Sequence, residues 1–211
     1  MQSISADEAL DRLRQGNQRY IADQPQRTVL GRQGLREELA QGQHPFAVVL
    51  GCADSRVPAE IVFDQDVGDL FVIRVAGHVV APAEVGSIEF AAEVLGARLV
   101  VVMGHTRCGA VGATLQQIRE PNPDLSPNLL ALVDHIRPSI LPVLEHVGEA
   151  SEADITEAAV RANVFGAVEA VQAQSPTVAR LVREDGLRIV GAEYDLGTGA
   201  VVFLTSEASA N

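Results

Sequence analysis

The sequence predicts an α/β fold in which a mostly parallel β-sheet is flanked by helices. Three observations predict it: apolar runs of strand length, the absence of period-two alternation within them, and helical patterns between them. The four runs, all rich in β-branched residues, are residues 45–51, 70–77, 97–104 and 187–194. Strands that are apolar on both faces are typical of parallel sheets covered by helices.

The N-terminal segment, residues 1–40, is predicted to be a helical arm. Ser5 and Glu8 have the spacing of a capping box, which marks the start of a helix. The expected elements of the arm are a helix over 6–20, a loop over 25–32 and a short helix over 35–40. We expect the arm to belong to a single domain that spans residues 1–211.

Helical patterns also separate and follow the predicted strands. They cover residues 84–95, 109–119, 128–147 and 152–173, and a last short helix starts at Ser175 and stops near Gly186. Pro138 and Pro142 lie inside the third pattern, so this helix is expected to be kinked or broken. Residues 198–205 are expected to form a fifth strand, which pairs antiparallel with the fourth through a turn.

The chain is acidic, with a formal net charge of -12. Such a charge repels nucleic acid and anionic membranes, so neither is expected as a partner. The stretch over residues 1–20 lacks a basic region followed by an apolar segment, and no apolar run approaches the roughly 18 residues of a membrane span. These features predict a cytoplasmic protein.

Reactive side chains follow two of the apolar runs directly. The stretch "VVLGCADSRVPAE" at 48–60 brings Cys52, and "VVVMGHTRCGAVG" at 100–112 brings His105 and Cys108. Ligand sites of open α/β sheets lie beyond the carboxyl ends of the strands. If the two strands are neighbours, two thiolates and one imidazole converge. That donor set suits Zn²⁺ and leaves a fourth position open.

Other interpretations of these residues remain open from their spacing alone. Two cysteines in a cytoplasmic chain are seldom a structural disulfide, but they could be buried inert thiols or a redox pair. Asp54, kept ionised by the adjacent Arg56, could accept a hydrogen bond from hydroxide at the open position. Alternatively, these two residues could form a surface pair that caps the next helix.

The two motifs together carry a resemblance to a known family. The sequence "CADSR" at 52–56, with "GHTRCGAV" at 104–111, resembles the β-class carbonic anhydrases, whose pattern is Cys-x-Asp-x-Arg followed by His-x-x-Cys. The resemblance implies the α/β fold described above. It also implies one Zn²⁺ ion per chain, with Cys52, His105 and Cys108 as its ligands.

The resemblance assigns further site residues. Asp54 and Arg56 match the family's catalytic dyad, in which the aspartate orients zinc-bound hydroxide or, in some members, swings onto zinc as a fourth ligand. The residues that match substrate-binding positions are Gln43, Phe71, Phe90 and Gly109. The glutamine would reach toward the substrate, the two phenylalanines would line a small apolar pocket, and the glycine would turn its backbone N–H toward the site.

The activity that the resemblance implies is zinc-dependent, reversible hydration of CO₂ to bicarbonate and a proton. The implied assembly is a homodimer or a higher even-numbered oligomer, in which the N-terminal arm embraces the partner and the sites lie near the interface. Two alternative functions remain: a hydrolase of CS₂ or COS on the same scaffold, and a zinc-binding or thiol-redox regulatory protein without turnover.

Two features depart from patterns within the family. Members with a closed form regulated by bicarbonate carry a tryptophan three residues before the first cysteine, where this chain has Val49; Arg74 and Tyr194 match the rest of that pocket. This difference favours a readily open site. His78 stands where many relatives have asparagine, and an additional titratable group there could serve proton transfer.

Overall fold

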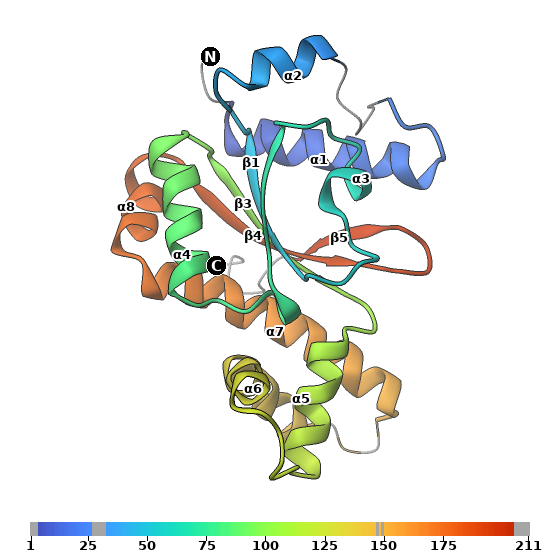
Figure 1. Ribbon diagram of the computed structural model, residues 1–211. Helices are drawn as coiled ribbons and strands as arrows, with labels where there is room; N and C mark the ends of the chain where they lie inside the picture. The colour runs from blue at the N-terminus through green and yellow to red at the C-terminus, as the bar shows by residue number, and fades with distance from the viewer. Residues whose placement is uncertain (1–3, 27–32, 147, 149, 205–211) are drawn as a thin grey trace, which may run out of the picture.

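The computed structural model describes residues 4–26, 33–146, 148 and 150–204, and a five-stranded sheet lies at its centre (Figure 1). The strands are β1 (Ala47–Gly51), β2 (Leu70–Arg74), β3 (Leu99–His105), β4 (Arg188–Tyr194) and β5 (Val201–Leu204). Their order across the sheet is β2-β1-β3-β4-β5. The first four strands are parallel and β5 pairs antiparallel with β4, which confirms the predicted fold class.

The register of the sheet places the two sequence motifs at the same edge. Strand β1 lies between β2 and β3, and Gly51 at its end pairs with Arg74 on one side and Met103 on the other. The residues that follow β1 and β3 therefore emerge side by side at the carboxyl end of the sheet. This adjacency is the condition on which the predicted metal site depends.

Helices cover both faces of the sheet, as Figure 1 shows. They are α1 (Ala6–Ile21), α2 (Gln33–Leu39), α3 (Ala59–Val62), α4 (Pro82–Glu89), α5 (Gly109–Arg119), α6 (Pro127–His146), α7 (Glu152–Gln174) and α8 (Pro176–Glu184), with shorter helical turns η1 (Ala76–His78) and η2 (Phe90–Val94). Successive strand residues face opposite layers: Val48 packs in the cluster that includes α4, α7 and α8, and Val49 packs in the cluster of α1 and α3. Burial on both faces explains why the strands lack polar alternation.

The N-terminal arm is only partly separate from the sheet. Helix α1 begins where the capping box predicted, because the Ser5 hydroxyl accepts a hydrogen bond from the Glu8 backbone N–H at 3.2 Å. Its apolar face, with Leu10 and Leu13, is buried in the core of its own chain. Helix α2, in contrast, is largely exposed. The role of the arm in dimerisation stays a prediction, as does the single domain over 1–211.

Helix α6 corrects one sequence prediction. It was expected to be broken or kinked at its prolines. The break is absent, because the structure has one uninterrupted helix through Pro138 and Pro142, and the kink stays a prediction. Both prolines are exposed, so the carbonyl groups that lose an N–H partner face water, while Ile136 and Ile140 anchor the opposite side. Residue 147 at the predicted end of this helix, most of the predicted loop (27–32) and residue 205 of the last strand lie outside the described residues.

The remaining helices lie close to their predicted bounds. The helix predicted over 84–95 starts two residues earlier, at Pro82, and its last part is the π-helical turn η2. Helices α5, α6 and α7 pack together below the carboxyl end of the sheet and enclose the two cysteines in an apolar cluster (Figure 1). Within the described part of the chain, no helix is both long enough and apolar enough to cross a membrane.

Candidate metal centre

Three potential metal ligands meet at the carboxyl end of the sheet. Cys52 directly follows β1, His105 is the last residue of β3, and Cys108 caps the start of α5. All three side chains are buried, and their ligand atoms lie within 4.8 Å of one another. Although 53 positions separate Cys52 from His105, neighbouring parallel strands bring them together, as the sequence predicted.

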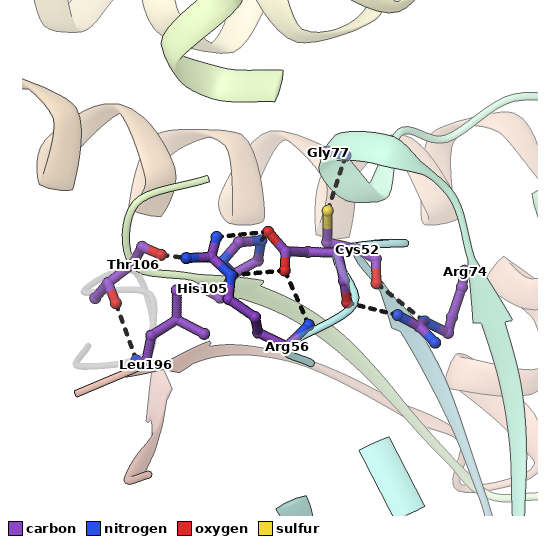
Figure 2. Close-up of polar contacts among 8 residues, drawn as sticks. Cys52, Arg56, Arg74, Gly77, His105, Thr106 and Leu196 are labelled. Carbon is purple, nitrogen blue, oxygen red and sulfur yellow. Dashed lines mark hydrogen bonds and ion pairs between the residues drawn. The ribbon is translucent and has the colours of Figure 1, made fainter. Parts of the chain in front are cut away.

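The imidazole of His105 is fixed in an orientation that suits metal binding. Its Nδ1 lies 2.9 Å from the Thr106 carbonyl oxygen, so Nδ1–H donates a hydrogen bond to that oxygen (Figure 2). The other ring nitrogen, Nε2, therefore carries the free lone pair that can bind a metal ion. Nε2 is buried and, among the described residues, has no hydrogen-bond partner. A buried polar atom without a partner is costly, and a bond to a metal ion would satisfy it.

The two cysteines are free thiols and do not form a disulfide. A hydrogen bond from Cys108 stabilises the Cys52 thiolate and lowers the pKa of Cys52. The same hydrogen bond, together with burial, raises the pKa of Cys108. Binding of a metal ion releases such a proton, because thiolates are the ligands. The pair is therefore set up to become a dithiolate around a cation.

Backbone groups support the charge on both sulfurs. The Gly77 N–H donates to the Cys52 sulfur at 3.3 Å (Figure 2). Cys108 stands at the N-terminus of α5, where exposed N–H groups and the helix dipole favour a thiolate. The Gly77 contact distinguishes Cys52 from an inert buried thiol, which has no need for a donor aimed at its sulfur.

Asp54 and Arg56 form a rigid ion pair beside the cluster. The Arg56 guanidinium donates from Nε to Oδ1 at 2.9 Å and from Nη2 to Oδ2 at 2.7 Å, and its backbone N–H donates to Oδ1 at 3.0 Å. These hydrogen bonds hold the pKa of Asp54 well below its usual range. Asp54 Oδ2 lies 3.9 Å from His105 Nε2. An ionised carboxylate thus borders the three ligands without belonging to them.

Arg74 holds the backbone of the same loop. Its Nε donates to the Cys52 carbonyl at 3.1 Å and its Nη2 donates to the Asp54 carbonyl at 2.6 Å (Figure 2). The resemblance matched Arg74 to a bicarbonate pocket, but here its guanidinium bridges the two carbonyl groups. This role follows from the pairing of β1 with β2, which the sequence motif does not reveal.

The predicted substrate-binding residues divide into two groups. Gly109 is the first residue of α5 and lines a cavity of about 400 Å³ that also reaches Ala76. Gln43, Phe71 and Phe90 lie elsewhere. Gln43 is exposed and precedes β1, and Phe71 pairs with Val48 near the amino end of the strands. The structure therefore does not bring these three to the metal ligands of the same chain.

The aromatic pair and the metal ligands are separated by the length of a strand. The rings of Phe71 and Phe90 contact each other, with centroids 6.3 Å apart. A strand of five residues separates its ends by about 13 Å. Phe90 is 45% exposed, although it is a large apolar side chain. Both observations place the aromatic pair away from the three candidate ligands of the same chain.

His78 does not fit the suggested role in proton transfer. The ring is fully buried, and this burial lowers the pKa of His78 to about 4. Its Nε2 lies 3.0 Å from the Asn163 side-chain nitrogen, which holds the ring in place. A histidine that stays neutral at physiological pH has a structural role here. Neither Asn163 nor Gly77 was singled out from the sequence, since no motif marks either residue.

Comparisons with known proteins agree with this site. A family model described as carbonic anhydrase matches residues 47–201. Carbonic anhydrase 2 of Mycobacterium tuberculosis is 40% identical over 195 residues, covering 90% of this chain and 88% of that protein. A carbonic anhydrase of Mycolicibacterium smegmatis is 43% identical over 189 residues, with the same coverage of 90% and 88%.

Solved structures show the same architecture. The β-carbonic anhydrase CcaA superposes with a TM-score of 0.74 at 26% identity, covering 94% of this chain and 93% of that chain. The β-carbonic anhydrase CafA of Aspergillus fumigatus gives a TM-score of 0.74 at 27% identity, covering 97% and 92%. With its fold, its ligand cluster and these relatives taken together, the chain belongs to the β-carbonic anhydrase family of enzymes.

Proposed function

We propose that this protein catalyses the reversible hydration of CO₂ to bicarbonate and a proton, with one zinc ion per chain. The observation that carries the proposal is the meeting of two cysteine sulfurs and a histidine nitrogen beside an ionised carboxylate. Membership of the family supports the reaction, and the donor set supports the metal.

Cys52, His105 and Cys108 would hold the zinc ion. Two sulfurs and one nitrogen are ligands that zinc prefers, and the orphaned Nε2 of His105 gains a bond when the ion is present. Three protein ligands leave a fourth position, which is the feature of a catalytic rather than a structural zinc site. When bound, the metal supplies a Lewis acid that makes water nucleophilic near neutral pH.

Asp54 would orient the nucleophilic water. Because Arg56 keeps the carboxylate ionised and holds both of its oxygens, Asp54 can accept a hydrogen bond in one fixed direction. Arg74 restrains the loop that carries this carboxylate. Capture of zinc by Asp54 itself, as a fourth ligand, remains a further prediction. It would require the carboxylate to leave Arg56, and the absence of tryptophan at Val49 disfavours a regulated closed form.

The partner subunit would complete the substrate pocket. Gln43, Phe71 and Phe90 match pocket positions, but they lie about a strand length from the metal ligands of their own chain. β2 is an edge strand, so the aromatic pair lies at a border of the sheet that a second copy can cover. Solved β-carbonic anhydrases of Sordaria macrospora are tetrameric. We propose a homodimer or a higher even-numbered oligomer, located in the cytoplasm.

Stopped-flow CO₂ hydration on protein of measured zinc content tests the function. The zinc-loaded protein should accelerate hydration, and the rate should rise between about pH 6.5 and 9 as hydroxide becomes available. His105→Ala should lose both zinc and activity. Parallel assays of sulfide release test CS₂ and COS as alternative substrates. A zinc-loaded protein that hydrates none of the three would indicate a regulatory protein instead.

A further inference from the structure

An unusual turn, η1, delivers the N–H group that contacts Cys52. Gly77 and His78 both have left-handed backbone conformations, with φ of 66° and 44°. A Cβ atom on Gly77 would lie 2.6 Å from Cδ1 of Ile136 and 3.0 Å from Cβ of Ala110, and the left-handed backbone would be strained for any other residue, so glycine is favoured here. A non-glycine residue such as His78 adopts this conformation at a cost, so the surroundings must hold it there.

Asn163 is the residue that holds this turn. It lies on α7, 86 positions after Gly77, and only 4% of it is exposed. Its Nδ2 donates to the Gly77 carbonyl at 2.9 Å and lies 3.0 Å from His78 Nε2. One buried amide group therefore binds both strained residues.

Gly77 is consequently fixed from both sides. Its carbonyl oxygen accepts from Asn163, and its N–H donates to the Cys52 sulfur at 3.3 Å. A hydrogen bond to a thiolate draws charge away from the sulfur, which weakens its donation to a metal and leaves the metal a stronger Lewis acid. The geometry links a residue on a distant helix to the electronic state of a metal ligand.

We propose that Asn163 is a positioning residue of the metal centre, which holds the Gly77–His78 turn so that the Gly77 N–H donates to the Cys52 sulfur. This inference rests on the proposed zinc site. A merely structural role for Asn163 would predict a loss of stability alone. The proposed role predicts, in addition, a change in the bond between Cys52 and the metal.

Cobalt-substituted protein tests the proposal without an activity assay. Co²⁺ bound by cysteine gives a sulfur-to-metal charge-transfer band, which reports the charge on the sulfur. Asn163→Leu keeps the volume and removes the donor, so the band should move to longer wavelength. Metal affinity should fall by about 10- to 100-fold, because the released turn no longer holds the Cys52 sulfur in place, and this loss outweighs the stronger donation of a sulfur without its hydrogen bond.

Two further variants separate this effect from loss of stability. Val171→Ala creates a cavity on the same helix, two turns away in another cluster, and should leave the band and the affinity unchanged. Asn163→Ser replaces the amide with a shorter hydroxyl group, which opens onto a cavity of about 320 Å³ that can admit water. It should fold readily and show a smaller shift in the same direction.

The outcomes distinguish this inference from the proposed function. If the wild-type protein shows no sulfur-to-cobalt band, the zinc site itself is refuted. If the wild-type protein shows the band, and the folded Asn163 variants keep its wavelength and the metal affinity, Asn163 has no positioning role. A shift in both Asn163 variants, with none in Val171→Ala, supports the proposal.

Discussion

Asp54 shows how neighbouring groups set the chemistry of one residue. Three hydrogen bonds from Arg56 keep its carboxylate ionised and fix both oxygens, and one of these oxygens lies 3.9 Å from the nearest ligand nitrogen. The pair could have capped the next helix, but it lies beside the three candidate ligands, where the proposed mechanism gives the carboxylate a use. The charge of the carboxylate and its orientation can therefore be changed separately, each by one variant.

Asp54→Asn should remove the charge and keep the metal. We expect one zinc per chain in this variant, because Asp54 lies outside the group of three ligands. Turnover should fall by about 10²-fold or more, the usual effect of removing a group that handles a proton in the transition state. Zinc analysis and stopped-flow hydration measure both quantities. Asp134→Asn, on the exposed side of α6, is the matched control. Unchanged turnover in Asp54→Asn would remove Asp54 from the mechanism.

Arg56→Gln should disturb the direction of the carboxylate and not its charge. Without the guanidinium, the pKa of Asp54 returns toward about 3.9, so the carboxylate is still ionised at every pH above 6. Turnover should fall by about 10- to 100-fold through misplacement alone. The midpoint of the pH profile between 6 and 9 should not move. A new loss of activity between pH 5 and 7 would contradict this assignment.

The sequence predicted the meeting of Cys52, His105 and Cys108 because local pattern marks each of them. Cys52 and His105 each follow an apolar run, and chemistry at the carboxyl ends of parallel strands is a general property of the fold. It did not predict what Arg74, Gly77 and Asn163 do, because their roles depend on contacts between elements that lie far apart in the chain. Hydrogen bonds to a backbone carbonyl or to a sulfur produce no recognisable spacing of residues along the sequence.

At the scale of elements, the docking of α1 depends on one close backbone approach. A Cβ atom on Gly16 would lie 1.8 Å from the Phe63 carbonyl oxygen. Gly16→Ala should therefore lower the free energy of unfolding by at least about 1–3 kcal/mol, the usual cost of overpacking. Urea denaturation measures this change. Gly34→Ala, on α2, has no atom within 4 Å of its Cβ and should be neutral or slightly stabilising. Equal stability of the two variants would show that α1 docks differently.

Helix α6 shows where prediction of elements fails. Proline disrupts the helical hydrogen bonds, and this local rule predicted a kink or a break. The rule takes no account of the surroundings of the helix. Pro138 and Pro142 are exposed, so the carbonyl groups that lose a partner face water, and Ile136 and Ile140 are buried on the opposite side and hold the helix in place. The positions of the strands and of most helices along the chain were more predictable, because their apolar patterns are long.

At the scale of the whole molecule, the proposed pocket makes activity depend on two chains. His105→Ala removes the metal from one chain, and Phe90→Ala removes an aromatic ring from the other. In a symmetric dimer, each mixed pair keeps one site with an intact metal cluster and an intact partner ring. The His105→Ala homodimer should be inactive and the Phe90→Ala homodimer weakly active. Random mixing should restore about a quarter of wild-type activity, since half the dimers are mixed and carry one good site of two.

Co-expression of the two variants and a hydration assay measure this recovery. The control is a mixture of the two purified homodimers under conditions that prevent exchange, which should show only the sum of their separate activities. If the co-expressed sample also shows only that sum, the aromatic residues do not serve the partner's site.

The most direct test is X-ray absorption spectroscopy at the zinc edge on the zinc-loaded protein. The proposed ligands predict two sulfur atoms at about 2.3 Å and one imidazole nitrogen at about 2.0–2.1 Å. A first shell of nitrogen and oxygen alone, or one with a single sulfur, would contradict the joint coordination of one ion by Cys52, His105 and Cys108.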